Sequence, residues 1–203
     1  MADDDAREDA HKLAGEGDPA AEAGEMQGEE EKPAPPDDEV AAAVVERFPD
    51  AIFHRSHGQP VVYVDRTVWA DLGRFLRDEQ RFTQCVDVTA VDHLLDAARI
   101  TVPGVTQERF EAVANYLSHP RNRRLRAICQ VPEGDAEVPS LTGVYPGTNF
   151  AEREVFDLFG IRFEGHPDLA RILMPDDWVG YPLRKDDAPA RVPVTFKEDP
   201  GPR

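Results

Sequence analysis

The sequence predicts an α+β fold, in which a mixed or antiparallel sheet carries helices packed on one face. Three stretches support this prediction, because apolar and polar side chains alternate along each of them: 82–95, 109–117 and 123–131. Alternation with a period of two is typical of strands with one wet face. Three such strands in succession indicate an antiparallel meander, and helical spacing before and after them supplies the covering layer.

The segments before the meander predict a helix, a hairpin and a second helix. Residues 40–48 have helical character, and Pro49 ends them. Two short β-type runs, 51–54 and 60–64, flank a connection with the composition of a hairpin. Thr67 is then expected to cap the second helix, whose apolar side chains recur at helical spacing.

The helix expected after the meander opens the region of the chain that is richest in paired charges, aromatics, glycines and prolines. Asn149 is predicted to cap this helix, and Glu152, three residues later, completes a capping-box pattern. Arg153 and Asp157 are four residues apart on another face of this helix, a spacing that allows them to form an ion pair. Gly160 is the expected stop, because glycine adopts the left-handed conformation without steric cost.

A short strand over 161–163 is expected to follow, and after it a long extended C-terminal tail. Turn sequences recur there, and the aromatic side chains of Trp178 and Tyr181 have no periodic partners within their own segment. Such a tail usually lies along another surface, on its own domain or on a partner.

The N-terminal 39 residues differ sharply from the rest. They hold fifteen acidic and three basic side chains, with no aromatic residue, no Ile or Val and a single Leu, and so account for most of the net charge of −17. Because they cannot bury enough apolar surface to offset ordering, they are expected to form a disordered, solvating extension. The predicted organisation is therefore an acidic extension (1–39), an α+β domain (40–165) and a docking tail (166–203). The mildly acidic domain also argues against a nucleic-acid binder.

The sequence lacks the residue patterns of several kinds of metal, phosphate-binding and catalytic site. Cys85 and Cys129 are far apart and no C-x-x-C occurs, so neither a Cys-ligated iron–sulfur cluster nor a zinc ribbon is expected. No glycine-rich phosphate loop or nucleophile elbow is present. No apolar run approaches the roughly 20 residues of a membrane-spanning helix, so no span is expected.

Two acidic groupings permit alternative interpretations. Glu152 and Glu154 could perform acid–base chemistry, but residues two apart on a helix point away from each other, which favours structural ion pairing. His166 and Asp168 could be a base and its orienting group, yet Gly-His-Pro-Asp is also typical of a turn in which Asp binds backbone groups. A free-standing hydrolase or lyase using Glu154, His166 and Asp168 remains an alternative with no accompanying nucleophile or metal.

A local basic patch is the remaining feature: Arg121, Arg123, Arg124 and Arg126. Arg124 and Arg126 share a predicted strand face, so these side chains are either solvated or paired with acids of a neighbour. Phosphate binding would lack the glycines and interleaved aromatics that usually support it.

Four linked motifs carry a resemblance to a known family. Glu152-Arg153-Glu154-x-x-Asp157-Leu158-Phe159-Gly160-Ile161 is followed by Gly165-His166-Pro167-Asp168-Leu169 and by Arg171-Ile172-Leu173, and Gly180-x-Pro182-Leu183-Arg184-Lys185-Asp186 comes after them. This pattern closely resembles the C subunit of respiratory complex I, the proton-pumping NADH:quinone oxidoreductase. The family usually has Trp at position 150 and His at position 181, where this chain has Phe150 and Tyr181.

The resemblance implies a protein of the peripheral arm without a catalytic centre or cofactor of its own. FMN, iron–sulfur clusters and quinone would belong to partner subunits, among them the quinone-site D subunit and cluster-bearing subunits. The location implied is the cytoplasmic side of the cell membrane, without a membrane span. The equivalent subunit of a membrane-bound hydrogenase or formate hydrogenlyase is the alternative. The motif residues would then form subunit interfaces: Glu152, Arg153, Glu154, Asp157, His166, Asp168, Arg171, Trp178, Arg184, Lys185 and Asp186.

Overall fold

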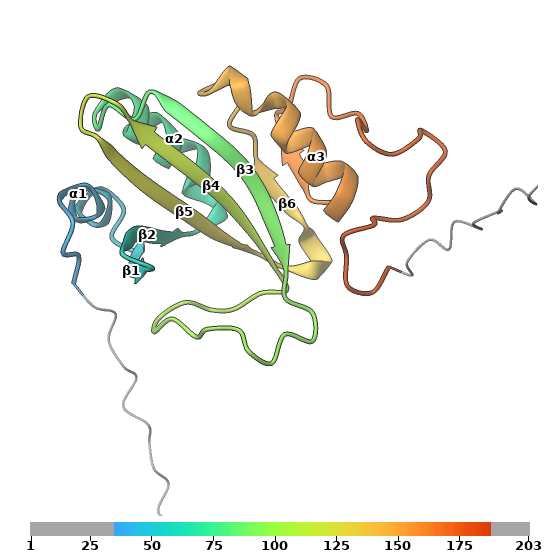
Figure 1. Ribbon diagram of the computed structural model, residues 1–203, viewed down its shortest axis with the longest axis horizontal. Coiled ribbons are helices and arrows are strands. Elements are labelled where there is room, and N and C mark those ends of the chain that lie inside the picture. Colours follow the sequence, from blue (N-terminus) through green and yellow to red (C-terminus); the bar gives the residue numbers. More distant parts are fainter. Residues whose placement is uncertain (1–34, 188–203) are drawn as a thin grey trace, which may run out of the picture.

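A computed structural model describes residues 35–187 of the chain (Figure 1). Its main sheet has the strand order β1-β2-β5-β4-β3, in which β2 and β5 are parallel and the other neighbours antiparallel. The predicted α+β class with a mixed sheet is therefore confirmed. The strands are β1 (Ile52–Ser56), β2 (Gln59–Val64), β3 (Gln84–Asp92), β4 (Phe110–Ser118) and β5 (Arg123–Val131).

The antiparallel meander is formed by β3, β4 and β5, each nine residues long, as the alternating patterns predicted. In β4 and β5 the paired residues Phe110 and Val131, or Ala114 and Ala127, lie opposite each other and are buried. β3 pairs only with β4, so it forms an edge of the sheet. The register of that pair shifts once, between Cys85 and Asp87.

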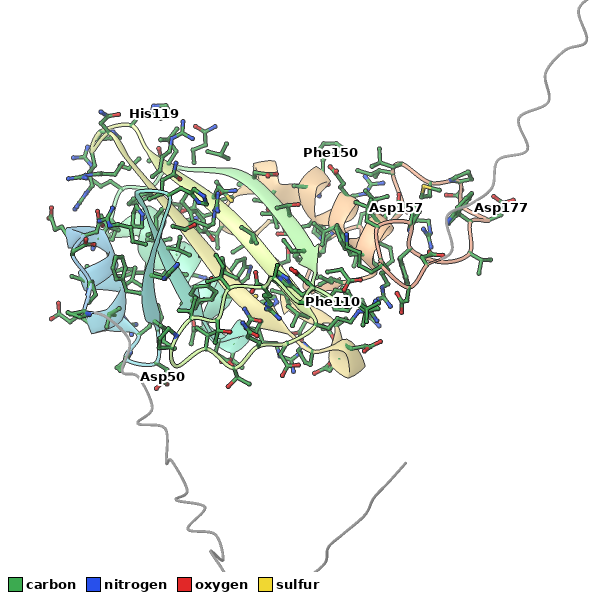
Figure 2. All side chains as sticks on the ribbon, turned by 60° about the horizontal axis from the view of Figure 1, so that its bottom comes forward. Asp50, Phe110, His119, Phe150, Asp157 and Asp177 are labelled. Carbon is green, nitrogen blue, oxygen red and sulfur yellow. The ribbon has the colours of Figure 1, made fainter. Side chains whose placement is uncertain are left out.

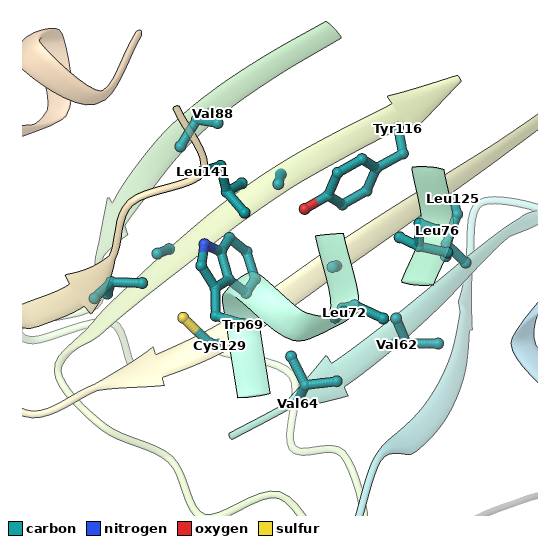
Figure 3. Packing of buried hydrophobic residues seen from close by; sticks show 14 of the residues in the cluster. Val62, Val64, Trp69, Leu72, Leu76, Val88, Tyr116, Leu125, Cys129 and Leu141 are labelled. Atoms are coloured by element: carbon teal, nitrogen blue, oxygen red, sulfur yellow. The ribbon is translucent and has the colours of Figure 1, made fainter. Parts of the chain in front are cut away.

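Three helices cover one face of this sheet: α1 (Glu39–Arg47), α2 (Trp69–Asp78) and α3 (Asn149–Phe159). Their buried apolar side chains join those of the strands in one cluster, at whose centre Trp69, Leu72 and Leu76 of α2 lie against the sheet (Figure 3). On the opposite face, the residues between 35 and 187 form a small buried cluster of Val61, Val113 and Ile128. The prediction of helices on one face thus agrees with the structure.

The N-terminal boundary of the folded region lies within the predicted acidic extension. Asp38 caps α1, because its carboxylate accepts hydrogen bonds from the amides of Val40 (3.0 Å) and Ala41 (3.1 Å). Asp37 pairs with Arg55 of β1. Residues 1–34, to which most of the expectation of a disordered extension applied, lie outside the described residues.

The connection between β1 and β2 is shorter than predicted. It consists of His57 and Gly58, both with positive φ (49° and 76°), as two-residue hairpin turns require. The prediction that Thr67 caps the second helix was also wrong. Asp65 accepts from the Thr67 amide (2.8 Å) at the start of a 3₁₀ turn (Arg66–Val68), and α2 follows at Trp69 without a side-chain cap.

α3 is placed by a small second sheet, in which β6 (Glu137–Pro139) and β7 (Arg162–Glu164) pair in parallel. A 3₁₀ turn (Glu133–Asp135) precedes β6, and another (Pro146–Thr148) leads directly into α3. β7 corresponds to the predicted strand over 161–163. The chain from 166 to 187 contains neither helix nor strand, and Figure 1 shows it beside α3. Residues 188–203 lie outside the described range.

Candidate functional site

The candidate site consists of α3 and the segment 166–187, which we call the C-terminal segment. Three buried carboxylates, Glu152, Asp157 and Asp92, organise it, and each holds a different stretch of backbone. Buried charges are rare unless they are paired or hydrogen-bonded, so each of these groups is expected to have a defined set of partners.

Glu152 holds the segment that leads into α3. Its carboxylate accepts hydrogen bonds from the Ser140 hydroxyl (2.6 Å) and the Leu141 amide (2.7 Å), and lies 3.1 Å from the Thr148 hydroxyl. The predicted capping box was therefore wrong: Asn149 is the first helical residue, and Thr148 at the N-cap makes no side-chain cap bond. The preceding 3₁₀ turn runs straight into α3, so the carboxylate is free to bind the 140–141 backbone instead.

Burial disfavours the charged form of the Glu152 carboxyl. Burial raises the pKa of this carboxyl above its ordinary value, and the hydrogen bonds from Ser140, Leu141 and Thr148 offset that effect only in part.

Asp157 holds the start of the C-terminal segment. Its Oδ2 accepts from three successive backbone amides, those of Ile172 (3.0 Å), Leu173 (2.7 Å) and Met174 (2.9 Å). Its Oδ1 accepts from Arg171 Nη1 at 2.7 Å, and the side chain of Asp157 is fully buried. Burial opposes ionisation, but the three amides and Arg171 outweigh it, so the pKa of Asp157 lies below its ordinary value.

The predicted pairing of Arg153 with Asp157 was wrong. Arg153 instead donates to the backbone carbonyls of Ala170 (2.9 Å) and Arg171 (3.2 Å). Asp157 takes Arg171 as its partner, and Arg171 also donates to the Gly180 carbonyl (3.1 Å). Arg153 and Asp157 both face the C-terminal segment, and the guanidinium of Arg171 lies against the buried Asp157 carboxylate in place of that of Arg153.

Gly160 ends α3 as predicted, with φ of 73°, and the structure adds a second reason for glycine. A Cβ atom here would lie 2.6 Å from the ring of Tyr181 and 2.7 Å from Nη2 of Arg184. Arg184 donates to the carbonyl of Phe159 (2.5 Å) and lies over the rings of Tyr181 (4.6 Å) and Phe110 (5.1 Å). The end of the C-terminal segment therefore packs directly on the end of α3.

Asp92, at the end of β3, forms the third cluster, which contains the predicted interface residues Lys185 and Asp186. The pairing of Asp92 with Arg109 was not predicted. Its carboxylate pairs with Arg109 (2.9 Å) and accepts from the amide of Lys185 (2.8 Å). Arg109 also pairs with Asp186 (2.5 Å) and Glu133 (2.5 Å). Burial opposes ionisation of Asp92, but Arg109 and the backbone amides outweigh it and lower its pKa to about 2.

A signal for this third cluster was present in the alternating pattern of β3. Val88, Ala90 and Asp92 lie on the same face of the strand, and that face is buried. A carboxylate at the third position of such a row requires a cationic or amide partner. Arg109, just before β4, is the nearest cation across the hairpin.

His166 and Asp168 do not form a base and its orienting carboxylate. The Nδ1 atom of His166 accepts from the amide of Asp168 (3.0 Å), and its Nε2 lies 3.2 Å from the carbonyl of Asn149. His166 therefore joins the C-terminal segment to the start of α3. The carboxylates of Glu154 and Asp168 are exposed, and Glu154 lies on the opposite side of α3 from Glu152. The geometry thus gives no support to the hydrolase or lyase alternative.

The remaining predicted interface residues, Trp178, Lys185 and Asp186, lie in the C-terminal segment. Trp178 is half-buried, and its indole N–H has no hydrogen-bond partner within residues 35–187. Lys185 contributes its backbone amide while its side chain is exposed, and Asp186 contributes its carboxylate to Arg109. Within residues 35–187, no group of three or more His, Cys, Asp or Glu side chains has a metal-binding arrangement.

The two cysteines are free thiols; Cys129 is buried and Cys85 half-buried. Burial raises the pKa of Cys85 to about 12 and that of Cys129 above its ordinary range. The helices between residues 35 and 187 include none with the length and hydropathy needed to cross a bilayer.

Comparison with known families shows which family contains the three carboxylate clusters. The model of the family described as "Respiratory-chain NADH dehydrogenase, 30 Kd subunit" matches residues 62–192, which begin within β2, extend past β7 and include all three carboxylate clusters. The chain belongs to this family. The motif resemblance found in the sequence is therefore confirmed, and with it the assignment to an oxidoreductase complex.

Individual relatives agree with this assignment. The C subunit of the NADH-quinone oxidoreductase of Geobacter sulfurreducens is 44% identical over 129 residues, which are 64% of this chain and 74% of the relative. The C/D subunit of the NADH-quinone oxidoreductase of Chromohalobacter salexigens is 41% identical over 159 residues, 76% of this chain but 26% of that longer relative. A solved trypsin-resistant fragment of Nqo5 is 32% identical, with a TM-score of 0.53, and the match covers 63% of this chain and 97% of the fragment.

Proposed function

We propose that this chain is a non-catalytic docking subunit of the peripheral arm of NADH–quinone oxidoreductase. In this role it packs beside the quinone-site D subunit and cluster-bearing subunits at the cytoplasmic side of the membrane. Electrons pass from NADH through FMN and iron–sulfur clusters of those partners to quinone. The chain contributes surface and rigidity to the coupled, proton-pumping complex.

The observation that carries this proposal is the exposure of apolar side chains on a firmly held segment. Eight large hydrophobic residues are exposed within residues 35–187, and three of them lie in the C-terminal segment: Leu173 (58%), Val179 (92%) and Leu183 (48%). The amide of Leu173 is bound by Asp157, and the amide of Leu183 donates to the carbonyl of Leu158 at 3.0 Å. Exposed apolar groups on pre-ordered backbone are typical of a protein interface, because less entropy is lost on binding.

The relatives support the choice of complex and of partner. Both relatives from Geobacter and Chromohalobacter carry the name NADH-quinone oxidoreductase, which favours this complex over a hydrogenase or formate hydrogenlyase. The Chromohalobacter relative is named with both letters, C and D, and a single chain carrying both names is consistent with two subunits that lie side by side.

The experiment is isolation of the tagged chain from its native membranes in mild detergent. We expect the quinone-site and cluster-bearing subunits to co-purify. Leu173→Glu together with Val179→Glu is expected to reduce their recovery at least tenfold, while Leu95→Glu, at an equally exposed position (91%) of the β3–β4 loop, leaves it unchanged. Isolation of the wild-type chain without these partners would refute the proposal.

A further inference from the structure

A polar groove lies at the end of the molecule away from the C-terminal segment. It has a volume of about 550 Å³ and runs between the start of α1, the β1–β2 hairpin and the β4–β5 hairpin. Figure 2 shows nitrogen-tipped side chains gathered around His119, in the β4–β5 hairpin, at the same end of the molecule as α1. Its lining combines both signs of charge: Arg55, His119, Arg123 and Arg124 with Asp37, Asp38 and Glu39.

The acids of this groove are the last residues of the acidic N-terminal run, and they already pair with the bases. Asp37 contacts Arg55 through both carboxylate oxygens, with distances of 2.7 Å to Nη2 and 3.0 Å to Nε. Glu39 lies 3.5 Å from Arg121. Asp38, besides capping α1, lies 3.9 Å from Arg123. Residues 37–39 therefore lie at the groove with their carboxylates directed at arginines.

Much of the basic lining still faces solvent. The side chain of Arg123 is 61% exposed despite its long contact with Asp38, and His119 and Arg124 are exposed. Arg124 forms no ion pair with any acid in residues 35–187. Arg81, which begins the approach to β3, is exposed as well. The acids seen in place, 37–39, leave this positive surface incompletely neutralised.

The chain itself carries the complementary charge immediately upstream. Residues 1–34 contain twelve acidic and three basic side chains, and Asp37 follows them closely in the sequence. A tethered segment reaches a neighbouring surface at an effective concentration in the millimolar range, so even weak exposed ion pairs suffice to hold it there.

We propose that the acidic residues 1–34 dock along this groove and cover the β4–β5 hairpin, as an extension of the ion pairs made by Asp37, Asp38 and Glu39. The contact is electrostatic and salt-sensitive, because exposed charges are screened within about 10 Å at 0.1 M salt. It makes the basic patch an internal docking surface of this chain, and other anionic segments must displace residues 1–34 to reach it.

A spin label on the full chain tests this docking directly. With the label at Ala20→Cys, in a Cys85→Ser background, we expect the amide signals of residues 119–126 to lose at least half their intensity at 50 mM NaCl. Signals of β7, which lies outside the groove, are expected to keep theirs. The loss should disappear at 500 mM NaCl and in the double variant Arg123→Glu and Arg124→Glu.

The matched control is Arg74→Glu with Arg162→Glu, which changes the net charge equally at exposed positions outside the groove and is expected to retain the effect. Unchanged hairpin signals at low salt would overturn the proposal. So would equal broadening in both double variants. A mixture of labelled and isotope-enriched unlabelled chains distinguishes a second copy, since broadening between chains would place another molecule's extension in the groove.

Discussion

The carboxylate of Asp157 and the guanidinium of Arg171, fourteen residues apart in the chain, form a 2.7 Å ion pair in which the Asp157 side chain is completely buried. The other oxygen of Asp157 binds three consecutive amides of the segment that follows Arg171. One side chain of α3 thus fixes the course of the backbone that carries Leu173, an exposed residue of the proposed interface.

Substitution Asp157→Asn is expected to release the C-terminal segment. Asparagine cannot balance the charge of Arg171, and removal of one partner of a buried ion pair typically costs about 3–5 kcal/mol. The change should appear as a lower free energy of unfolding in denaturant and as faster proteolysis within 170–187. Asp168→Asn is the control, because that carboxylate is exposed in the same motif. Equal stability of the two variants would contradict the role assigned to Asp157.

Gly160→Ala is expected to separate α3 from the end of the C-terminal segment. A non-glycine residue at φ of 73° costs about 1–3 kcal/mol. The added methyl group would also displace Tyr181 and Arg184, which lie where it must go. Hydrogen exchange at the Leu183 amide should accelerate by at least tenfold. Gly143→Ala, where a methyl group meets no atom within 4 Å, should leave both stability and exchange unchanged.

Acid is expected to open the Asp92 cluster. Its pKa of about 2 lies below the ordinary value of 3.8, so the ionised group stabilises the fold above about pH 4. That contribution is lost progressively as the pH falls through about 2. Unfolding measured between pH 2 and 6 should show this slope, and Asp92→Asn should remove it while costing about 3 kcal/mol at neutral pH. A variant with the slope of the wild type would exclude Asp92 as its source.

Glu152 is expected to show the opposite pH dependence. Its pKa is raised in the fold, so its contribution is fully present below the unfolded value and declines as the pH rises through the folded one. Glu152→Gln should abolish this decline and change stability by less than about 1 kcal/mol at neutral pH. Glu152→Ala leaves the Leu141 amide unpaired and opens a cavity, which should cost about 3 kcal/mol. Glu154→Gln, at an exposed position, is the control.

The sequence was sufficient to predict features that depend on local pattern. The strand β5 coincides with the alternating run 123–131, because a sheet with one buried face selects side chains with a period of two. The end of α3 at Gly160 was equally predictable, because a left-handed terminus favours glycine. The separate acidic composition of 1–39 was evident as well.

Features that depend on distant partners could not be predicted in this way. Arg153 has the right spacing to pair with Asp157, but Arg171 arrives from another segment and takes that position. The capping pattern at Glu152 failed for a related reason, since Ser140 and Leu141 compete for the carboxylate and burial favours that arrangement. The spacing of side chains within one helix does not show which other segment of the chain will pack on that helix.

Asp92 receives a hydrogen bond from Lys185, a residue 93 positions farther along the chain. Because Asp92 and Arg109 precede Lys185 in the chain, they are synthesised well before the residue whose amide binds Asp92. Only when the region around Lys185 emerges are Arg109 and Asp92 enclosed. A chain shortened before Lys185 would lack both the amide that binds Asp92 and the Asp186 carboxylate that pairs with Arg109, and would leave these two groups accessible to water.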